Sequence, residues 1–216
     1  MDPPSERGID EWRLGVATEV RRARPDEIDD VAGVLADAFA DYPWTRFTIA
    51  ADHHRLRVRG LQRLALELIG FDHGDVWVAL ADDQMVGAAV FTDSRAPAPE
   101  SVVAELHERS IEFTGDRLQQ SIEAHASIAG LLPDRLHVSL DVVGVRTAWQ
   151  RRGVGDAVIG PGLDDADRKG LPVRLETSAI ENVRFYARRG FAVTDHIDVG
   201  GVEVWAMLRT NGRPPR

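Results

Sequence analysis

The sequence predicts a mixed α/β fold in which helices cover both faces of one central, mostly antiparallel β-sheet. Two β-hairpins, over residues 76–91 and 191–209, supply antiparallel strands. Between them lie an apolar strand at residues 137–145, a helix at 152–169 and a strand at 173–177, in the order that connects parallel neighbours. Hairpins and a crossover in one chain predict a single mixed sheet with helices packed on it.

The N-terminal part of the chain predicts a strand followed by a helix. Residues 1–15 are polar and contain prolines, so we expect a flexible leader, with one domain over residues 16–216. A first strand is expected at residues 16–24. Pro25 then starts a helix, because proline fits the first turn and the two acids that follow it suit the helix dipole. This helix is expected to end before Pro43.

Three further helices are expected between the first helix and the central strand. The first of them, at residues 52–69, has an apolar face to which we assign Leu56, Leu61, Leu64 and Leu68. The other two are at residues 101–113 and 116–132. After the crossover, a helix at residues 181–189 precedes the last hairpin, and these helices supply the layers around the sheet.

The composition limits the classes of function. The chain has 216 residues, 44% hydrophobic and 28% charged, which predicts a packed globular core. A formal net charge of −9 argues against non-specific binding to nucleic acid or membranes, and no apolar run could span a bilayer. The absence of cysteine excludes disulfides and a thiolate nucleophile, and the histidines form no metal motif. We expect a cytoplasmic protein without a metal, as a monomer or a homodimer.

The stretch WQRRGVGD, residues 149–156, places two arginines and two glycines at the start of a helix. The first turn of a helix leaves backbone N–H groups unpaired and attracts anions. Gly153 and Gly155 would let an anion approach the backbone, and Arg151 and Arg152 could each reach a phosphate. The pattern predicts a pyrophosphate-binding loop. Taken alone, it fits a glycine-bearing loop with two solvated arginines equally well.

The surroundings of this loop resemble a known family. The pattern Gln150-x-x-Gly153-x-Gly155, after a strand that ends in Val143-Gly144-Val145, resembles the pyrophosphate motif of the GNAT acetyltransferases. The stretches at residues 175–178 and 185–191 resemble the same family, and the likeness covers about residues 17–209. This resemblance implies the GNAT fold and acetyl-CoA as the acetyl donor.

The resemblance implies two groups of donor-binding residues. The backbone of Val143, Gly144 and Val145 would pair with the pantetheine arm, unless this is an ordinary buried strand. The pyrophosphate would lie against Gln150, Arg151, Arg152, Gly153, Val154, Gly155 and Asp156. Asp156 would repel phosphates, so we expect it to point away. Many members carry an asparagine where this chain has Ala179, and Asn182 is the candidate replacement.

The resemblance also implies two catalytic residues. Glu176 would take a proton from the amine, because an ammonium has no lone pair with which to attack. Strand alternation puts Arg174 on the same face, so a Glu176–Arg174 pair is the alternative. Tyr186 would protonate the departing thiolate, with a packed core aromatic as the alternative.

The acceptor site is predicted at the joint between the first two helices. Tyr42 and Trp44 are expected to stack on an aromatic amine, with a buried helix corner as an equal alternative. Residues 38–43 and 160–162 resemble the branch of the family that acetylates puromycin. We therefore expect acetyl transfer to the primary amine of a small, puromycin-like molecule, by direct attack in a ternary complex. A peptide N-acetyltransferase and a non-catalytic acetyl-CoA sensor are the alternatives.

Overall fold

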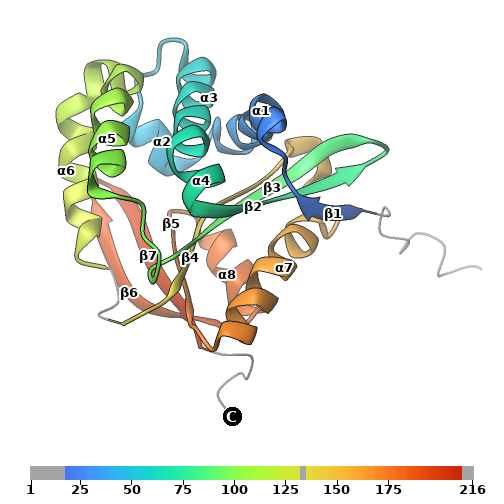
Figure 1. Cartoon of the computed structure of the whole chain (residues 1–216). Coiled ribbons are helices and arrows are strands. Elements are labelled where there is room, and N and C mark those ends of the chain that lie inside the picture. The colour runs from blue at the N-terminus through green and yellow to red at the C-terminus, as the bar shows by residue number, and fades with distance from the viewer. Residues whose placement is uncertain (1–17, 132–134, 211–216) are drawn as a thin grey trace, which may run out of the picture.

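The strands form one sheet in the computed structural model, which describes residues 18–131 and 135–210. The strands are β1 (Glu19–Arg22), β2 (Gly74–Ala81), β3 (Gln84–Asp93), β4 (Val138–Val145), β5 (Val173–Thr177), β6 (Phe191–Val199) and β7 (Val202–Arg209). Their order across the sheet is β1-β2-β3-β4-β5-β7-β6 (Figure 1). Neighbours are antiparallel except β4 and β5, which are parallel. The predicted mixed, mostly antiparallel sheet is confirmed.

Helices cover both faces of this sheet, as predicted. They are α1 (Ile28–Phe39), α2 (Pro43–Thr48), α3 (His54–Ala65), α4 (Phe71–His73), α5 (Glu100–Thr114), α6 (Leu118–Ala129), α7 (Val154–Lys169) and α8 (Ile180–Ala187). Helix α1 packs on β3 and β4 from one side, and α7 packs on β2, β3 and β4 from the other (Figure 1). Each face has its own apolar core, one containing Leu35 and Val78 and the other containing Ile159 and Val173.

A buried carboxylate holds the start of α1 in place. Pro25–Glu27 forms one 3₁₀ turn before the helix. The Glu27 side chain is 11% exposed and lies 2.7 Å from a guanidinium nitrogen of Arg21. It also accepts a 2.8 Å hydrogen bond from the backbone N–H of Arg24. The Arg21 hydrogen bond is the main cause that lowers the pKa of Glu27 to about 2.

Three sequence predictions for the N-terminal part of the chain are wrong or lie outside the described residues. Leu56 does not belong to the apolar face of α3, because 68% of it is exposed, whereas Val58 is fully buried. Side chains two residues apart in a helix point to nearly opposite sides, so Leu56 was wrongly included. Leu64 is buried and Leu61 packs beside Val58, as the predicted face requires. The first strand is shorter than predicted and begins at Glu19. The leader expected at residues 1–15 lies outside the described residues.

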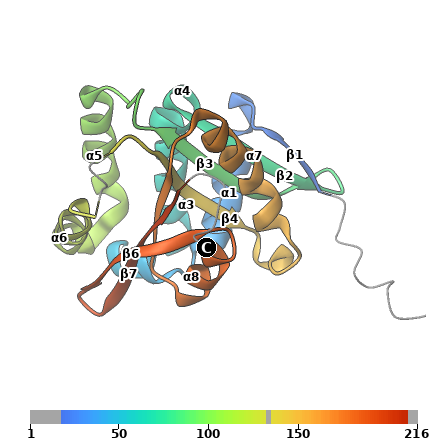
Figure 2. The same cartoon turned by 90° about the horizontal axis from the view of Figure 1, so that it is seen from below.

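The connection between β3 and β4 is much longer than the sheet requires. Antiparallel neighbours can be joined by a two-residue turn. Here residues 94–137 intervene and include α5 and α6. These two helices lie at the end of the sheet away from β1, where α5 packs on α3 and α6 packs on α2 (Figure 2). We call the described part of this connection, residues 94–131 and 135–137, the α5–α6 insertion.

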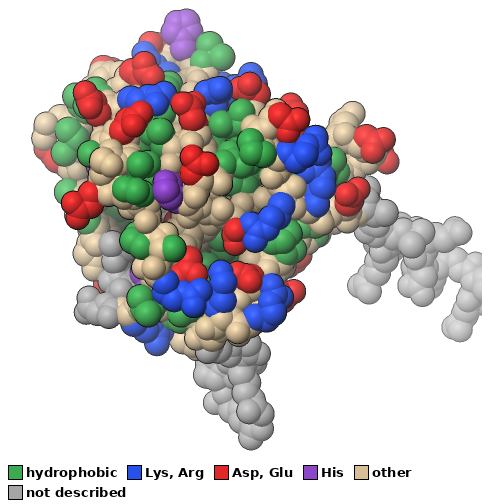
Figure 3. Space-filling model, in the orientation of Figure 1, with side chains coloured by type: hydrophobic (Ala, Val, Ile, Leu, Met, Phe, Trp, Pro, Cys, Tyr) green, Lys and Arg blue, Asp and Glu red, His purple; other side chains and the backbone are tan. Residues whose placement is uncertain are grey.

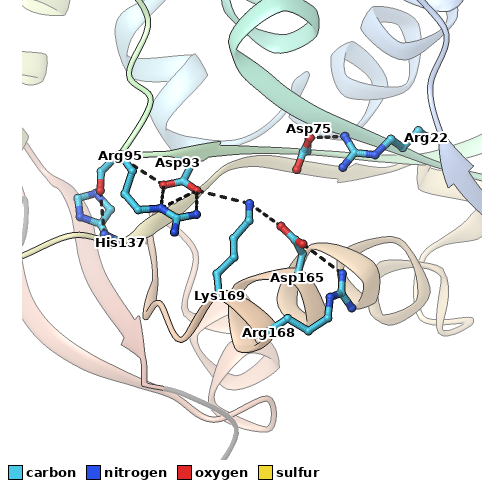
Figure 4. Close-up of polar contacts among 9 residues, drawn as sticks. Arg22, Asp75, Asp93, Arg95, His137, Asp165, Arg168 and Lys169 are labelled. Carbon is cyan, nitrogen blue, oxygen red and sulfur yellow. Dashed lines mark hydrogen bonds and ion pairs between the residues drawn. The ribbon is translucent and has the colours of Figure 1, made fainter.

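Helix α7 is fastened to the sheet at its middle and at its C-terminal end. Gly162 lies so close to β3 that an added Cβ would be 2.3 Å from the Phe91 ring. At the end of the helix, Lys169 lies 2.6 Å from Asp165 and 3.4 Å from Asp93 of β3 (Figure 4). Asp93 also accepts hydrogen bonds from Arg95 (Figure 4). Charged side chains of both signs are spread over this face of the molecule, so it has no uniform charge (Figure 3).

Candidate active site

The two parallel strands of the sheet separate soon after they meet. β4 and β5 are paired only at Val138 with Val173 and Ser139 with Arg174. Beyond Ser139, β4 stays paired with β3 as far as Val145, and no described strand pairs with its other edge. The backbone groups of Val143–Val145 on that edge are therefore available to an extended ligand. The predicted donor strand is where the sheet opens.

A cavity of about 470 Å³ lies beside this separation. β4 and β5 supply Val142, Val143, Glu176 and Thr177, and α8 supplies Asn182 and Tyr186. The opposite walls come from α2, α3 and the α5–α6 insertion, including Trp44, Leu61, Leu106 and Ile128. The structure thus brings Tyr42, Trp44, Glu176, Asn182 and Tyr186, predicted from separate parts of the sequence, to one cavity.

The loop before α7 presents an open helix N-terminus. Gly153 caps the helix with φ +85°, and an added Cβ there would meet nothing within 4 Å. Arg151 and Arg152 are exposed, and the Arg152 guanidinium lies 5.2 Å from the centre of the Trp149 ring. Gln150 donates a 3.3 Å hydrogen bond to the carbonyl of Val145, which joins the loop to the end of β4. The backbone N–H groups of the first turn of α7, the open space at Gly153 and the cations of Arg151 and Arg152 together suit a pyrophosphate.

Two residues of this loop face away from the open helix end. Asp156 forms an ion pair with Arg189, whose guanidinium lies 3.6 Å from the centre of the Phe185 ring. The charge of Asp156 is therefore compensated from the end of α8. The Val154 side chain is 1% exposed in the core, so this residue could offer a ligand only its backbone. An added Cβ at Gly155 would lie 3.3 Å from Phe185.

Tyr186 is both packed and open to the cavity. Its ring makes edge-to-face contacts with Phe185 at 5.0 Å and Phe191 at 5.5 Å between centroids. The residue is 6% exposed and also lines the cavity. Burial, and to a lesser extent Tyr42, raise the pKa of the Tyr186 phenol above its usual value. The phenol therefore keeps its proton at physiological pH and can donate it.

Glu176 has features of both alternatives that the sequence left open, a residue facing the reacting amine and an ion pair with Arg174. Its carboxylate lines the cavity and is also paired with Arg174. The Arg174 side chain is 14% exposed and lies 3.4 Å from the hydroxyl of Ser139. Glu176 is thus an oriented carboxylate in the cavity whose charge already has one partner.

Asp141 is a second cavity carboxylate, which the sequence analysis missed. It is the extra residue of a β-bulge, because Val142 pairs with Val90 and Leu140 with Phe91. Asp141 is exposed to solvent and lines the cavity. Desolvation by the protein atoms packed around the carboxylate raises the pKa of Asp141 to about 6, and the charge of Glu176 adds to this, against the opposing effects of Thr92 and Arg174. A single acid in the apolar stretch Val138–Val145 was the signal that could have found it.

Hydrogen bonds fix the polar side chains between α2 and β5. The Tyr42 hydroxyl accepts a 2.5 Å hydrogen bond from the backbone N–H of Ser178 and lies 2.9 Å from the Thr177 hydroxyl. Asn182 donates a 3.1 Å hydrogen bond to the same hydroxyl. The Trp44 ring lies edge-on to His125 of α6, with 5.3 Å between centroids. These contacts orient the predicted acceptor residues toward one cavity.

Residues 18–131 and 135–210 contain neither a candidate metal centre nor a candidate membrane span. In those residues, no three His, Asp or Glu side chains are grouped so that they could hold a metal ion. None of the helices there is both long and apolar enough to cross a membrane.

A sequence model described as the acetyltransferase (GNAT) family matches residues 36–191 of this chain. That range contains the opened strand β4, the loop before α7, Asp141, Glu176 and Tyr186. It covers well over half of the chain.

Solved structures of acetyltransferases share the fold at low sequence identity. A structure titled histone acetyltransferase HPA2 and related acetyltransferase, from Corynebacterium glutamicum, has a TM-score of 0.70 and 21% identity, covering 92% of this chain and 99% of its own. Arylalkylamine N-acetyltransferase 2 from Aedes aegypti has a TM-score of 0.58 and 13% identity, covering 90% and 99%. PaiA N-acetyltransferase from Thermoplasma acidophilum, in complex with coenzyme A, has a TM-score of 0.55 and 12% identity, covering 90% and 99%.

Proposed function

The chain belongs to the GNAT acetyltransferase family, and from that premise we propose that it acetylates the primary amine of a small, puromycin-like molecule. The enzyme takes its acetyl group from acetyl-CoA, as members of this family do. The observation that carries the choice of acceptor is the α5–α6 insertion, which forms one wall of the cavity beside β4 and β5. A cytoplasmic location, and a monomer or homodimer, are part of the same proposal.

The donor would lie along the opened edge of β4. Val143, Gly144 and Val145 offer backbone groups to the pantetheine arm, and the loop at residues 150–156 offers N–H groups and two arginines to the pyrophosphate. Within the loop, Arg151, Arg152 and Gly153 face the ligand, whereas Asp156 is held by Arg189. Asn182 lines the same cavity as Val143 of β4, and it would contact acetyl-CoA near its thioester group.

The chemistry requires one proton acceptor and one proton donor. After the ammonium has lost one proton, the amine nitrogen bonds to the thioester carbonyl carbon. The carbon–sulfur bond then breaks, the sulfur leaves as a thiol with a proton from Tyr186, and the second proton released by the nitrogen restores the Tyr186 phenol. Asp141 and Glu176 attract the ammonium, and Asp141 takes its proton, since a carboxylate with a pKa of about 6 is basic enough to do so near neutral pH. Tyr186 supplies the proton to the sulfur.

The shape of the cavity favours a small acceptor over a protein chain. A peptide N-terminus enters an active site with the rest of its chain extending outward, which requires an open groove. Here Leu106, Ser110 and Ile128 of the insertion face the cavity from the side opposite β4. Tyr42 and Trp44 add aromatic surface. The sequence likeness to puromycin N-acetyltransferase at Ala38–Pro43 makes an aminonucleoside the first acceptor to test.

The first experiment measures thiol released from acetyl-CoA in the presence of puromycin, simple primary amines and peptides with free N-termini. We expect release with puromycin or with another small amine, and loss of that release in Tyr186→Phe. Release with peptides alone would contradict the proposed acceptor and support a peptide acetyltransferase. Acetyl-CoA binding by calorimetry without release on any acceptor would support a sensor instead.

A further inference from the structure

Charge is distributed unevenly around the α5–α6 insertion. The insertion residues that line the cavity are Leu106, Ser110, Thr114, Ser121, His125 and Ile128. The glutamates of α5 and α6 are all exposed and none of them lines the cavity: Glu100, Glu105, Glu108, Glu112 and Glu123. Within the described residues, this wall therefore offers no negative charge to a ligand.

The carboxylates that line the cavity lie at its reacting end. Among the described residues they are Asp141 on β4 and Glu176 on β5, one on each side of the strand separation. They are close enough for the charge of Glu176 to act on Asp141. An ammonium placed for reaction has both as partners. A second cation in the same ligand would be desolvated without a partner, which is strongly unfavourable.

The other walls suit an uncharged ligand body. Ile49, Leu61, Ala65 and Ile69 supply apolar surface. His125 donates from Nδ1 to the Ser121 carbonyl at 2.7 Å, so its ring is held beside Trp44. Neutral groups such as Gln62 and Thr114 can hydrogen-bond a neutral polar substituent. No described residue on these walls carries a negative charge, so a guanidinium or a second ammonium would have no counter-charge there.

We infer that this cavity selects amines with a single cationic group, carried on an apolar or aromatic body, and that the α5–α6 insertion determines the selection. The inference rests on the proposed function and adds to it that diamines and guanidino-amines are rejected. The selection is electrostatic: the reacting ammonium is neutralised by Asp141 and Glu176, while the far wall provides no counter-charge.

A matched pair of acceptors tests the inference on the full-length protein. Agmatine and 4-phenylbutylamine share a four-carbon primary amine and differ in a terminal guanidinium or phenyl group. We expect kcat/KM for 4-phenylbutylamine to exceed that for agmatine by at least about tenfold, because the unpaired guanidinium must be desolvated. Agmatine used equally well or better would overturn the inference and leave small-amine acetylation intact.

Two serine variants test the role of the insertion. Ser110 lines the cavity and its hydroxyl donates to the His107 carbonyl at 2.8 Å. Ser127 does not line the cavity, is exposed, and its hydroxyl donates to the Glu123 carbonyl at 2.8 Å. We expect Ser110→Asp to lower the ratio of kcat/KM for 4-phenylbutylamine to kcat/KM for agmatine by about fivefold, because the new carboxylate gives the guanidinium a partner. Ser127→Asp should leave this ratio unchanged. An equal effect of both variants would overturn the assignment to the cavity wall.

The same assays separate this inference from the proposed function. Acetyl-CoA binding without thiol release on either amine, on puromycin or on peptides would contradict amine acetylation itself, and the inference with it. Turnover of puromycin together with agmatine preferred over 4-phenylbutylamine would contradict only the charge selection.

Discussion

The proposed donor site and the proposed acceptor cavity beside it, here called the donor side and the acceptor side, are built in opposite ways. The donor side comes from one continuous stretch, in which β4, the loop at residues 150–156 and α7 follow each other in the chain. The acceptor side is assembled from α2, α3, α5 and α6, which are distant in sequence and meet only in the fold. The difference teaches that a ligand bound by backbone groups leaves a local sequence pattern, whereas a ligand bound by packed side chains leaves none.

The largest expected effect of a single substitution is at Gly153, on the donor side. Gly153→Glu should reduce acetyl-CoA affinity by at least about a hundredfold, because a carboxylate would stand at the open helix end. Calorimetric titration measures this. Gly130→Glu is the matched control on the acceptor side, where an added Cβ also meets nothing.

Backbone strain at Gly153, where φ is +85°, is tested separately with Gly153→Ala. Equal loss in Gly153→Ala and Gly153→Glu would mean that strain, and not charge, explains the effect.

Tyr186 lies between the two sides and should separate chemistry from binding. Tyr186→Phe removes only the hydroxyl of a packed ring, so we expect kcat to fall by about a hundredfold and acetyl-CoA affinity to change by less than about twofold. Steady-state kinetics and calorimetry give the two numbers. A parallel loss in both would refute proton donation by this phenol.

Asp141 is expected to set the acid limb of activity. Its pKa is raised to about 6, so the carboxylate accepts a proton above pH 6 and is already protonated below it. At saturating amine, kcat should therefore fall as the pH drops through about 6. Asp141→Asn should remove this limb and lower kcat at pH 8 by about thirtyfold. Glu176→Gln is the control, and a limb that disappears only in Glu176→Gln would reverse the two roles.

The smallest effect on activity is expected at Glu27, outside both sides of the cavity. Its pKa is lowered to about 2 in the fold from 4.5, so its contribution to stability is present above pH 4.5 and is lost as the pH falls through 2. Glu27→Gln should reduce the free energy of unfolding by about 2 kcal/mol at pH 7, with kcat unchanged. Urea unfolding at pH 7 and pH 2 measures the difference, which should shrink at pH 2. A difference that persists at low pH would argue against the ion pair as its source.

The sequence predicted the strands of the sheet better than the helix faces and the cavity, for physical reasons. The positions of β5 and β7 agree with the prediction to the residue, because alternating apolar residues between turns mark strands clearly. Gly153 and the arginines beside it remain a predicted anion site, and they could be predicted because such a site needs a particular backbone. Leu56 was misplaced because a leucine-rich helix has several plausible faces until its neighbours are known. Asp141 was missed because its role depends on a bulge that only strand pairing reveals.

The brief pairing of β4 with β5 also affects how the molecule resists unfolding. The strand blocks β1–β4 and β5–β7 share two registered residue pairs, so a donor lying along Val143–Val145 would bridge an interruption in the sheet. Acetyl-CoA would then stabilise the sheet as well as supply the acetyl group. Its occupancy should slow amide hydrogen exchange along β4 and raise the melting temperature with ligand concentration.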